Sequence, residues 1–228
     1  IKYGADVVKV AVTGGILSKG TIPSAGQYSD EELRAIVEEA HRLGRKVAAH
    51  AHGADGLRQA VRAGVDSIEH GSLIDEEGIR LMKARRTYLV PTLYAGDWFL
   101  KNAAPPQVQQ DMIDKAREML PLARANVSRA LRSGVRVALG TDSSVYPHGE
   151  NSNELSALVA GGLTPLAALQ AATINAADLL GWADRVGLLL PGFYADLIAV
   201  AGDPLADIRL LSQVPVVMKG GELIKRAS

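Results

Sequence analysis

Five apolar, strand-like runs of this chain each carry, at or near their carboxyl end, a polar side chain that could bind a metal ion or a substrate. Strands that alternate with helices form parallel sheets. The carboxyl ends of parallel strands lie at one edge of the sheet, so residues that are far apart in the sequence meet there. The sequence therefore predicts a single site at that edge. Its candidate residues, in chain order, are Lys9, His50, His52, His70, Tyr94 and Asp142.

Lys9 lies within the run VVKVAV, whose composition predicts a strand that is buried on both faces. A buried ammonium group is costly, and burial favours the neutral amine. A neutral lysine amine can react with carbon dioxide to form a carbamate, an anionic ligand that can bridge two cations. The alternative is a lysine paired with a carboxylate elsewhere in the fold.

His50 and His52 are two positions apart, so in a strand both side chains point to the same face. Neutral imidazole is a common zinc ligand, although one of the two could instead bind a backbone carbonyl. His70 ends a third strand, in which Ile68 and His70 are expected to share one face. Taken alone, His70 is more typical of a hydrogen-bonded structural histidine. Its position at a further strand end favours a ligand.

Three more residues follow later strands. Asp142 comes after the fifth strand, where a carboxylate can bind a metal and accept the proton of a metal-bound water. Its alternative role is to cap the next helix. Tyr94 could donate its hydroxyl to a substrate or pack at the rim, and His148 could contact substrate or be solvated.

The hydrophobic periods predict a regular alternation of strands and helices. Ser29, with Glu32 three residues later, has the pattern of a capping box, and Gly44, Gly64 and Gly134 are typical helix stops. A loop carrying Trp98, Pro105 and Pro106 is expected before the longest helix. The expected strands are residues 6–12, 46–51, 67–70, 87–93 and 135–139, and the expected helices are residues 29–43, 55–63, 75–85, 107–132 and one that opens at Thr164 and Pro165.

The pattern changes near residue 186, after which short alternating runs predict a small β unit with a hairpin turn at Gly220 and Gly221. We therefore expect two parts, a barrel domain over residues 1–185 and a β unit over residues 186–228. The first residue is Ile1 rather than Met. We interpret the chain as the carboxyl-terminal part of something longer.

Composition limits the partners. The chain has 228 residues, 47% of them hydrophobic, with a net charge of zero and no basic cluster, which argues against nucleic acid or an anionic membrane surface as the main partner. It has no Cys, so any metal must be held by nitrogen and oxygen ligands. No apolar run approaches the roughly 18 residues of a membrane span. The compartment stays unknown, with a cytoplasmic or an exported location both compatible.

The ordered motifs VVKVAVTGG, VAAHAHG, AGVDSIEHG, GTDSSVYPHG, LTPLAALQAATINAADLLG and VGLLLPGFYADLIAVAGDPLADI resemble the amidohydrolase superfamily over nearly the whole chain. The branch it is most similar to holds prolidase-like (Xaa-Pro dipeptidase) and carboxypeptidase-like enzymes, including ochratoxin-type amide hydrolases. The resemblance implies an α/β fold, in which the chain is the carboxyl-terminal part of a (β/α)8 barrel, about five βα units, followed by part of a small β-sandwich.

The resemblance also implies roles for the candidate residues. Lys9 would be carboxylated and bridge two divalent metal ions, usually zinc. His50 and His70 would bind the second metal, and Asp142 would bind the first metal and shuttle the proton. His52 would polarise the substrate carbonyl, with Tyr94 and His148 as further substrate contacts.

The implied reaction is hydrolysis of the amide bond of a dipeptide or N-acyl amino acid by a metal-bridging hydroxide. The alternatives are a hydrolase of cyclic, imidazolone-type amides and an inactive fragment that acts only as an assembly module. One departure is that the His-x-His pair of the family's first strand has no counterpart upstream of Lys9. We therefore expect three strands to be absent, the site of this chain alone to be incomplete, and the chain to associate with copies of itself or with its missing amino-terminal part.

Overall fold

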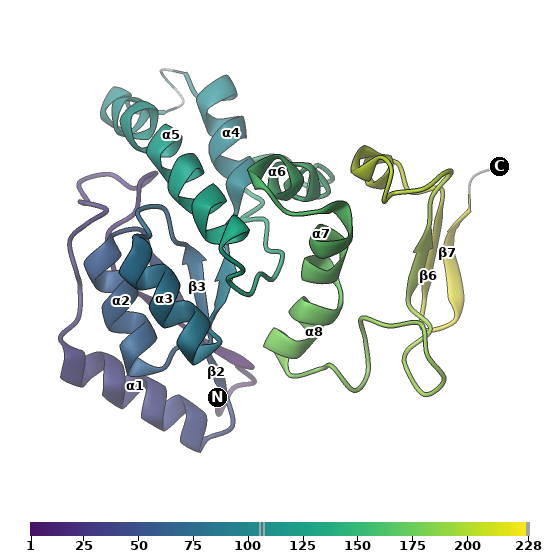
Figure 1. The fold of residues 1–228 in the computed structure, drawn as a ribbon, viewed down its shortest axis with the longest axis horizontal. Coiled ribbons are helices and arrows are strands. Elements are labelled where there is room, and N and C mark those ends of the chain that lie inside the picture. Colours follow the sequence, from purple (N-terminus) through teal and green to yellow (C-terminus); the bar gives the residue numbers. More distant parts are fainter. Residues whose placement is uncertain (105, 107, 227–228) are drawn as a thin grey trace.

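Four parallel strands form the sheet that carries the candidate residues. The computed structural model describes residues 1–104, 106 and 108–226. Neighbouring strands are hydrogen-bonded in the order of the sequence, β1-β2-β3-β4 (Figure 1). The strands are β1 (Val7–Ala11), β2 (Lys46–Ala51), β3 (Ser67–His70) and β4 (Tyr88–Val90).

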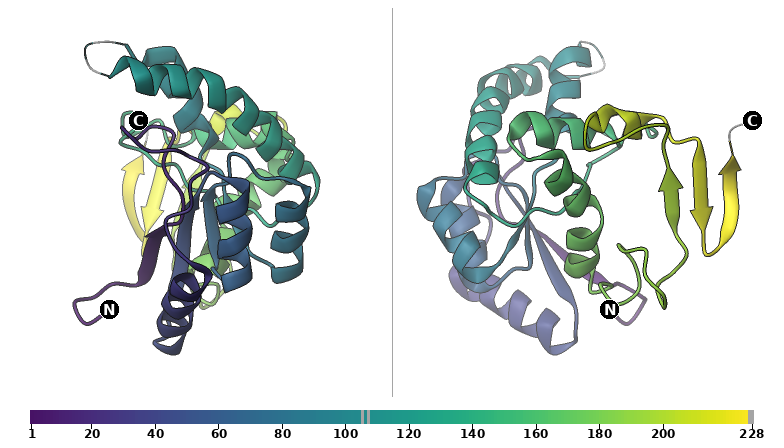
Figure 2. Two further views of the ribbon diagram at one scale, coloured as in Figure 1. Left: turned by 90° about the vertical axis from the view of Figure 1, so that its left-hand side faces the viewer. Right: turned by 45° about the vertical axis from the view of Figure 1, so that its right-hand side comes forward.

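Three helices cover one face of this sheet, as both views in Figure 2 show. They are α1 (Asp30–Arg42), α2 (Ala54–Ala63) and α3 (Glu76–Arg85). The predicted capping box is confirmed, because Ser29 and Glu32 each accept a hydrogen bond from the other's backbone N–H. Alternate residues of β2, namely Val47, Ala49 and Ala51, are fully buried against these helices.

The opposite face of the sheet is covered by described residues over β4 but is open at β1, and this contradicts the expectation that β1 is buried on both faces. Val10 and Val12 pack into the core, but Val7 is 38% exposed and Lys9 is also exposed. Apolar β-branched residues on both sides of the strand made it resemble a central strand. In the described chain β1 has one neighbour, β2, and one covered face.

The chain reverses after β4 earlier than the sequence indicated. The strand expected over 87–93 ends at Val90, and helix α4 (Leu93–Asn102) begins three residues later, so Trp98 lies in a helix and not in a loop. The long helix, α5, spans Gln110–Arg132. Pro105 and Gln107, parts of the expected loop and helix start, lie outside the described residues.

The expected fifth strand is reduced to a single parallel bridge between Val137 and Leu89. The Leu89 N–H donates to the Arg136 carbonyl and the Ala138 N–H to the Leu89 carbonyl, so residues 136–138 still run beside β4. Three helices follow. They are α6 (Asn153–Gly161), α7 (Pro165–Ala172), capped by Thr164 as predicted, and α8 (Ile174–Leu180).

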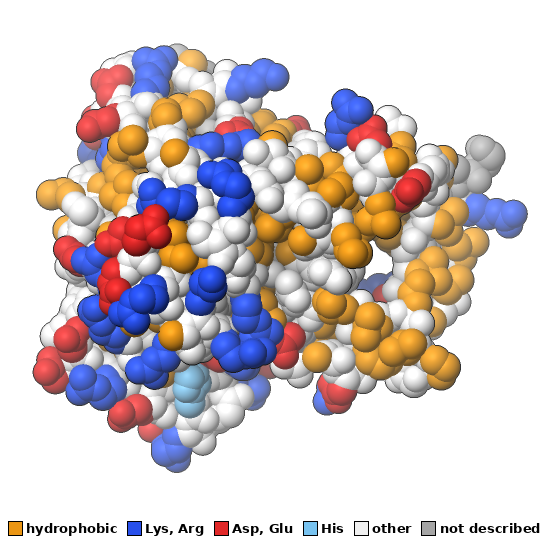
Figure 3. Space-filling model, in the orientation of Figure 1, with side chains coloured by type: hydrophobic (Ala, Val, Ile, Leu, Met, Phe, Trp, Pro, Cys, Tyr) orange, Lys and Arg blue, Asp and Glu red, His pale blue; other side chains and the backbone are white. Residues whose placement is uncertain are grey.

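A separate antiparallel sheet stands at the carboxyl-terminal end (Figure 1). The predicted hairpin turn is confirmed at Gly220 and Gly221, both with positive φ, as a two-residue turn of this kind requires. Exposed apolar side chains gather over this unit, whereas charged side chains cover the α1–α3 side (Figure 3). The elements of this unit are β5 (Leu197–Ala199), the 3-10 helix η1 (Ile208–Ser212), β6 (Val216–Lys219) and β7 (Glu222–Arg226).

Within the described residues, no helix has both the length and the apolar character that crossing a membrane requires.

Helix α4 is capped by a carboxylate from another helix. Its N-cap residue, Thr92, has a left-handed backbone (φ 49°) and makes no side-chain bond to the helix. Instead, the N–H groups of Leu93 and Tyr94 donate to the two carboxylate oxygens of Glu154, at 2.9 and 2.7 Å. Glu154 is fully buried, and this burial raises its pKa to about 8, although the two N–H donors favour the charged form.

We expect this carboxyl to make the protein less stable as the pH rises. The folded-state pKa lies above the ordinary value of 4.5, so between these values the folded protein keeps a proton that the unfolded chain has released. The free energy of unfolding should therefore fall between about pH 5 and about pH 9, by an amount on the order of 3 kcal/mol from Glu154.

Urea unfolding at several pH values measures this effect. Glu154→Gln, which cannot ionise, should have a flatter profile than the wild type, and Glu118→Gln, at an exposed position of α5, is the matched control. Equal slopes for the wild type and Glu154→Gln would contradict the assignment.

Candidate metal centre

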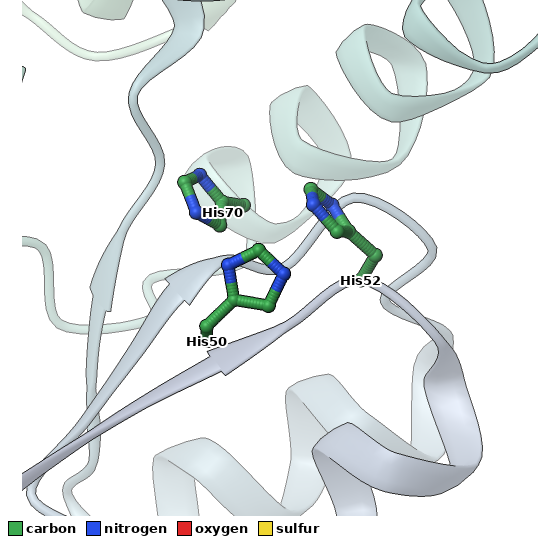
Figure 4. Close-up of side chains that lie close together, drawn as sticks. All are labelled: His50, His52 and His70. Carbon is green, nitrogen blue, oxygen red and sulfur yellow. The ribbon is translucent and has the colours of Figure 1, made fainter. Parts of the chain in front are cut away.

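Three histidines converge at the carboxyl ends of β2 and β3. His50 lies near the end of β2, His52 directly follows that strand, and His70 ends β3. Their ring centroids are 4.6 to 4.8 Å apart, and one ring nitrogen of each lies within 4.8 Å of the others. Figure 4 shows the three rings turned toward one another. The prediction that His50 and His52 point to the same place is confirmed.

His70 reaches this cluster through an unusual backbone conformation. Ile68, two residues earlier, is fully buried in the core, and regular alternation would direct His70 to that same face. His70 instead has a φ of 70°, which is rare for a residue with a side chain and turns it toward the cavity. The expectation that Ile68 and His70 share one face is therefore wrong.

The cluster lines a cavity of about 320 Å³. Lys9 of β1 and Asp142, from the loop after residues 136–138, line the same cavity. Loop residues 15–18, which follow β1, form one wall, and Thr92 and Gly96 at the start of α4 form another. The structure thus brings together five of the residues that the sequence singled out, from four separate segments.

Asp142 is held by its loop and not by a helix. It has a φ of 51°, and the next helix, α6, begins at Asn153, so the alternative that Asp142 caps the following helix is wrong. The Asn151 amide donates to the hydroxyls of Thr141 and Ser143 at 3.2 and 3.1 Å. These two bonds bracket Asp142 and restrain the loop on both sides of it.

Tyr94 and His148 lie elsewhere. Neither is among the described residues that line the cavity. Tyr94 belongs to the first turn of α4, where its hydroxyl donates to Glu150 and its ring packs edge-on against Tyr146. His148 is exposed, with Nδ1 3.3 Å from the Ser143 hydroxyl. This geometry favours the rim-packing and solvated-loop alternatives for the two side chains.

Two hydroxyls that sequence reasoning missed orient the histidine rings. Nδ1 of His52 is 2.7 Å from the Ser72 hydroxyl, and Nδ1 of His70 is 2.7 Å from the Thr92 hydroxyl. Both contacts leave Nε2 free to act in the cavity. A hydroxyl can donate to a ring nitrogen or accept from it, so each histidine can adopt the tautomer that its task requires. In the sequence, the only indication of this role is that Ser72 and Thr92 each lie a few positions beyond the end of a strand.

Burial keeps these imidazoles neutral. It lowers the pKa of His52 to about 3 and that of His70 well below its ordinary value, in both cases with help from neighbouring positive charges. Burial also lowers the pKa of His50, although a hydrogen bond with the Gly14 backbone and the charge of Asp142 act in the opposite direction. The neutral form is the one that binds metal ions.

The donor set therefore fits a divalent cation. It combines three neutral imidazoles with a carboxylate and a lysine, and imidazole and carboxylate together suit zinc and similar metals. The pairing of Lys9 with a carboxylate stays open as its alternative role, because the charge of Lys9 acts to lower the pKa of Glu69, which burial raises overall.

A second, apolar cavity of about 430 Å³ adjoins the first. The two share Leu17 and Val145 in their walls. The other side chains are mostly apolar, and the amide of Asn102 already donates to the Trp98 carbonyl. The remaining lining residues are Trp98, Phe99, Asn102, Ala103, Ala104, Val108 and Met112.

Comparison with known proteins gives a consistent result. The sequence model of the amidohydrolase family matches residues 1–224. An ochratoxinase of Aspergillus niger is 40% identical over 230 aligned positions, which cover 99% of this chain and 47% of that protein. An imidazolonepropionase of Deinococcus deserti is 30% identical over 187 positions, covering 79% of this chain and 41% of that protein.

Among solved structures, a Xaa-Pro dipeptidase with methionine bound in its active site superimposes with a TM-score of 0.94. It is 41% identical, and the match covers 98% of this chain and 55% of that one. The chain thus spans about half the length of the relatives that it matches.

We expect Thr92→Val to weaken binding of a divalent cation about 10- to 100-fold in the complete protein, because it removes the hydroxyl that orients His70 while keeping the branched shape. Calorimetric titration of the metal-free protein with Zn²⁺ measures the affinity. Thr92→Ser keeps the hydroxyl and is the control. Unchanged affinity in Thr92→Val would show that His70 needs no orienting partner.

Proposed function

The chain belongs to the amidohydrolase family, and from that membership we propose that its complete protein is a metal-dependent hydrolase that cleaves the amide bond of a dipeptide or an N-acyl amino acid. The observation that carries the proposal is the shared cavity, in which Lys9, His50, His70 and Asp142 meet from four segments. The similarity to an ochratoxinase and to a Xaa-Pro dipeptidase supports an amide substrate.

Four residues would hold two divalent cations, for which we propose zinc. His50 and His70 would bind one ion, Asp142 the other, and a carboxylated Lys9 would bridge them. Carboxylation joins the neutral Lys9 amine to the carbon of carbon dioxide and releases a proton. When bound, the cations would polarise the carbonyl of the amide and make a water molecule acidic enough to attack it near neutral pH.

We assign the proton transfer to Asp142. Its carboxylate reaches the cavity from a loop that Asn151 restrains, so it can accept the proton of the attacking water and deliver it to the departing amine. Without that delivery the amine is a poor leaving group.

His52 is assigned to the substrate carbonyl. Its low pKa keeps the ring neutral, and a neutral ring carries one N–H. When the Ser72 hydroxyl donates to Nδ1, that N–H must be on Nε2, where it can donate to the carbonyl oxygen. The oxygen gains negative charge as the amide is attacked, so this hydrogen bond strengthens during the reaction.

The adjoining apolar cavity supports a substrate with a bulky apolar group. Its described walls carry no charged side chain, so they offer no opposite charge to the carboxylate of an amino-acid substrate. The carboxylate would bind elsewhere, and an aromatic or branched group would extend past Leu17 and Val145.

We also propose that residues 1–185 belong to a (β/α)8 barrel and residues 186–228 to a composite β-sandwich. In the complete protein, further strands would pair with the open edge of β1, cover the exposed face around Lys9 and supply a His-x-His pair for the first metal. The exposed apolar side chains of the β5–β7 unit are consistent with a covering partner, either that additional part or a second copy.

The complete, metal-loaded protein should hydrolyse N-acyl amino acids or dipeptides faster than cyclic imidazolone-type amides, as amine release measures. Asp142→Asn should lower turnover at least about 100-fold, because it removes the proton acceptor. Faster hydrolysis of the cyclic amide would favour the alternative substrate class. No hydrolysis of either class by the metal-loaded protein would favour a non-catalytic assembly module.

The same assay separates the role of His52 from that of a ligand. His52→Phe should lower turnover by more than it lowers metal content, since we assign this side chain to the substrate. Metal analysis by mass spectrometry supplies the second measurement. Loss of metal in step with activity would make His52 a ligand.

Carboxylation of Lys9 should be measurable independently of turnover. Metal-free protein loaded with Zn²⁺ and ¹³C-bicarbonate should give a carbamate carbon signal in NMR, and Lys9→Ala should not. Loading in the absence of carbon dioxide should leave one of the two metal ions weakly bound, because the bridging ligand is then missing. A fully loaded protein with an unmodified Lys9 would contradict the proposal.

A further inference from the structure

We propose that the Lys115 ammonium group is a built-in cation that holds the wall-forming loop over the cavity, which makes Lys115 a positioning residue for the site. The loop tip, residues 15–21, follows β1, and Lys115 lies on α5, about a hundred positions later in the chain. Only the expected effect of Lys115 on catalysis rests on the proposed function, and its effect on the loop does not.

The Lys115 ammonium group donates to three backbone carbonyls of this tip. Nζ lies 3.2 Å from the Gly15 oxygen, 2.6 Å from that of Ser18 and 3.2 Å from that of Thr21. An ammonium group has three N–H donors, so all of them are used on one short segment. Ordinary surface lysines are different. Lys83, for example, donates to the single carbonyl of Ser133.

Convergence of three carbonyl oxygens is unfavourable without a positive charge between them. Their dipoles point their negative ends at the same spot, and the Lys115 charge offsets this repulsion. The Thr21 hydroxyl adds contacts with the Gly15 and Ser18 carbonyls, at 2.9 and 3.2 Å, which keep the tip tightly folded. Hydrogen bonds from a charged donor are stronger than those between neutral groups, so Lys115 is the main polar anchor of the tip.

The base of the loop does not need this anchor. There the Gly14 N–H donates to the Ala25 carbonyl and the Gln27 N–H to the Val12 carbonyl, which together form a short backbone ladder. Beyond this ladder, the tip is attached to α5 by Lys115 and by Ile16, which is buried in an apolar cluster with Ile113 and Ala116. Loss of Lys115 should therefore open the tip and leave the base in place.

Opening the tip would act directly on the cavity. Residues 15–18 form one of its walls, and Leu17 also separates it from the apolar cavity. The Gly14 backbone next to the tip hydrogen-bonds with His50, which lines the same cavity. The tip therefore sets the shape of the cavity beside this histidine. We expect its loosening to raise KM more than it lowers kcat.

Lys115→Met in the complete protein tests the proposal, since methionine keeps an unbranched apolar stem and removes the charge. Hydrogen exchange followed by mass spectrometry should show residues 15–21 exchanging about 10- to 100-fold faster, with the base of the loop unchanged. KM should rise about tenfold with unchanged metal content. Lys83→Met is the matched control and should change neither quantity.

Chemical rescue distinguishes a cation site from a general packing effect. Lys115→Ala leaves room for a small ammonium ion, so ethylammonium should slow exchange at residues 15–21 and lower KM toward the wild-type value. Tetramethylammonium has the same charge but no N–H donor and should do neither. Lys115→Arg, which keeps the charge on a planar group, should exchange at an intermediate rate and serves if the smaller variants fail to fold.

Wild-type exchange at residues 15–21 in Lys115→Met, or in Lys115→Arg if the smaller variants fail to fold, would overturn the proposal. The proposal would also be overturned if exchange in Lys115→Ala were faster and either both ammonium ions or neither of them slowed it. These exchange measurements do not depend on hydrolysis. A protein without amidase activity would therefore refute the proposed function and still give a result for Lys115.

Discussion

The parallel register of β2 against its two neighbours is the constraint on which the site depends. Lys9 is paired with Ala48 and Ala51 with His70, and these pairs set which side chains meet beyond the strand ends. A slip of one residue would turn His50 into the helix layer, where Ala49 and Ala51 are now fully buried. Apolar contacts between the sheet and helices α1–α3 therefore hold the register, and the same contacts determine how close the imidazoles lie.

Beyond the strand ends, the site relies on backbone conformations that side chains usually avoid. His70, Thr92 and Asp142 all have positive φ, and each such residue costs on the order of 1 kcal/mol or more. Surrounding hydrogen bonds offset that cost. The Thr92 hydroxyl serves His70 and leaves its own helix uncapped, and Glu154 then caps that helix from α6. A carboxylate outside the cavity thus supports the position of a histidine inside it.

The sequence predicted features that depend on local residues. Apolar runs located β1, β2 and β3 and the histidines at the ends of β2 and β3, and short motifs identified the Ser29 capping box and the Gly220 turn. The sequence did not predict features that depend on residues far away in the chain. Helix α4 depends on the reversal at Thr92 and on the cap from Glu154, and Lys9 is exposed because no element of the described chain covers it. The contacts of Lys115 join the loop to a helix about a hundred residues later. None of these leaves a local pattern.

The contacts of Lys115 also bear on the order in which the protein folds. β1, β2 and β3 pair with neighbours in the sequence, whereas Lys115 and Ser18 are 97 positions apart. Contacts across a long stretch of chain form late, because the entropy of closing the loop must be overcome first. A folding molecule would therefore bring its three clustered histidines together before it closes the pocket around them, and for that interval they would face open solvent.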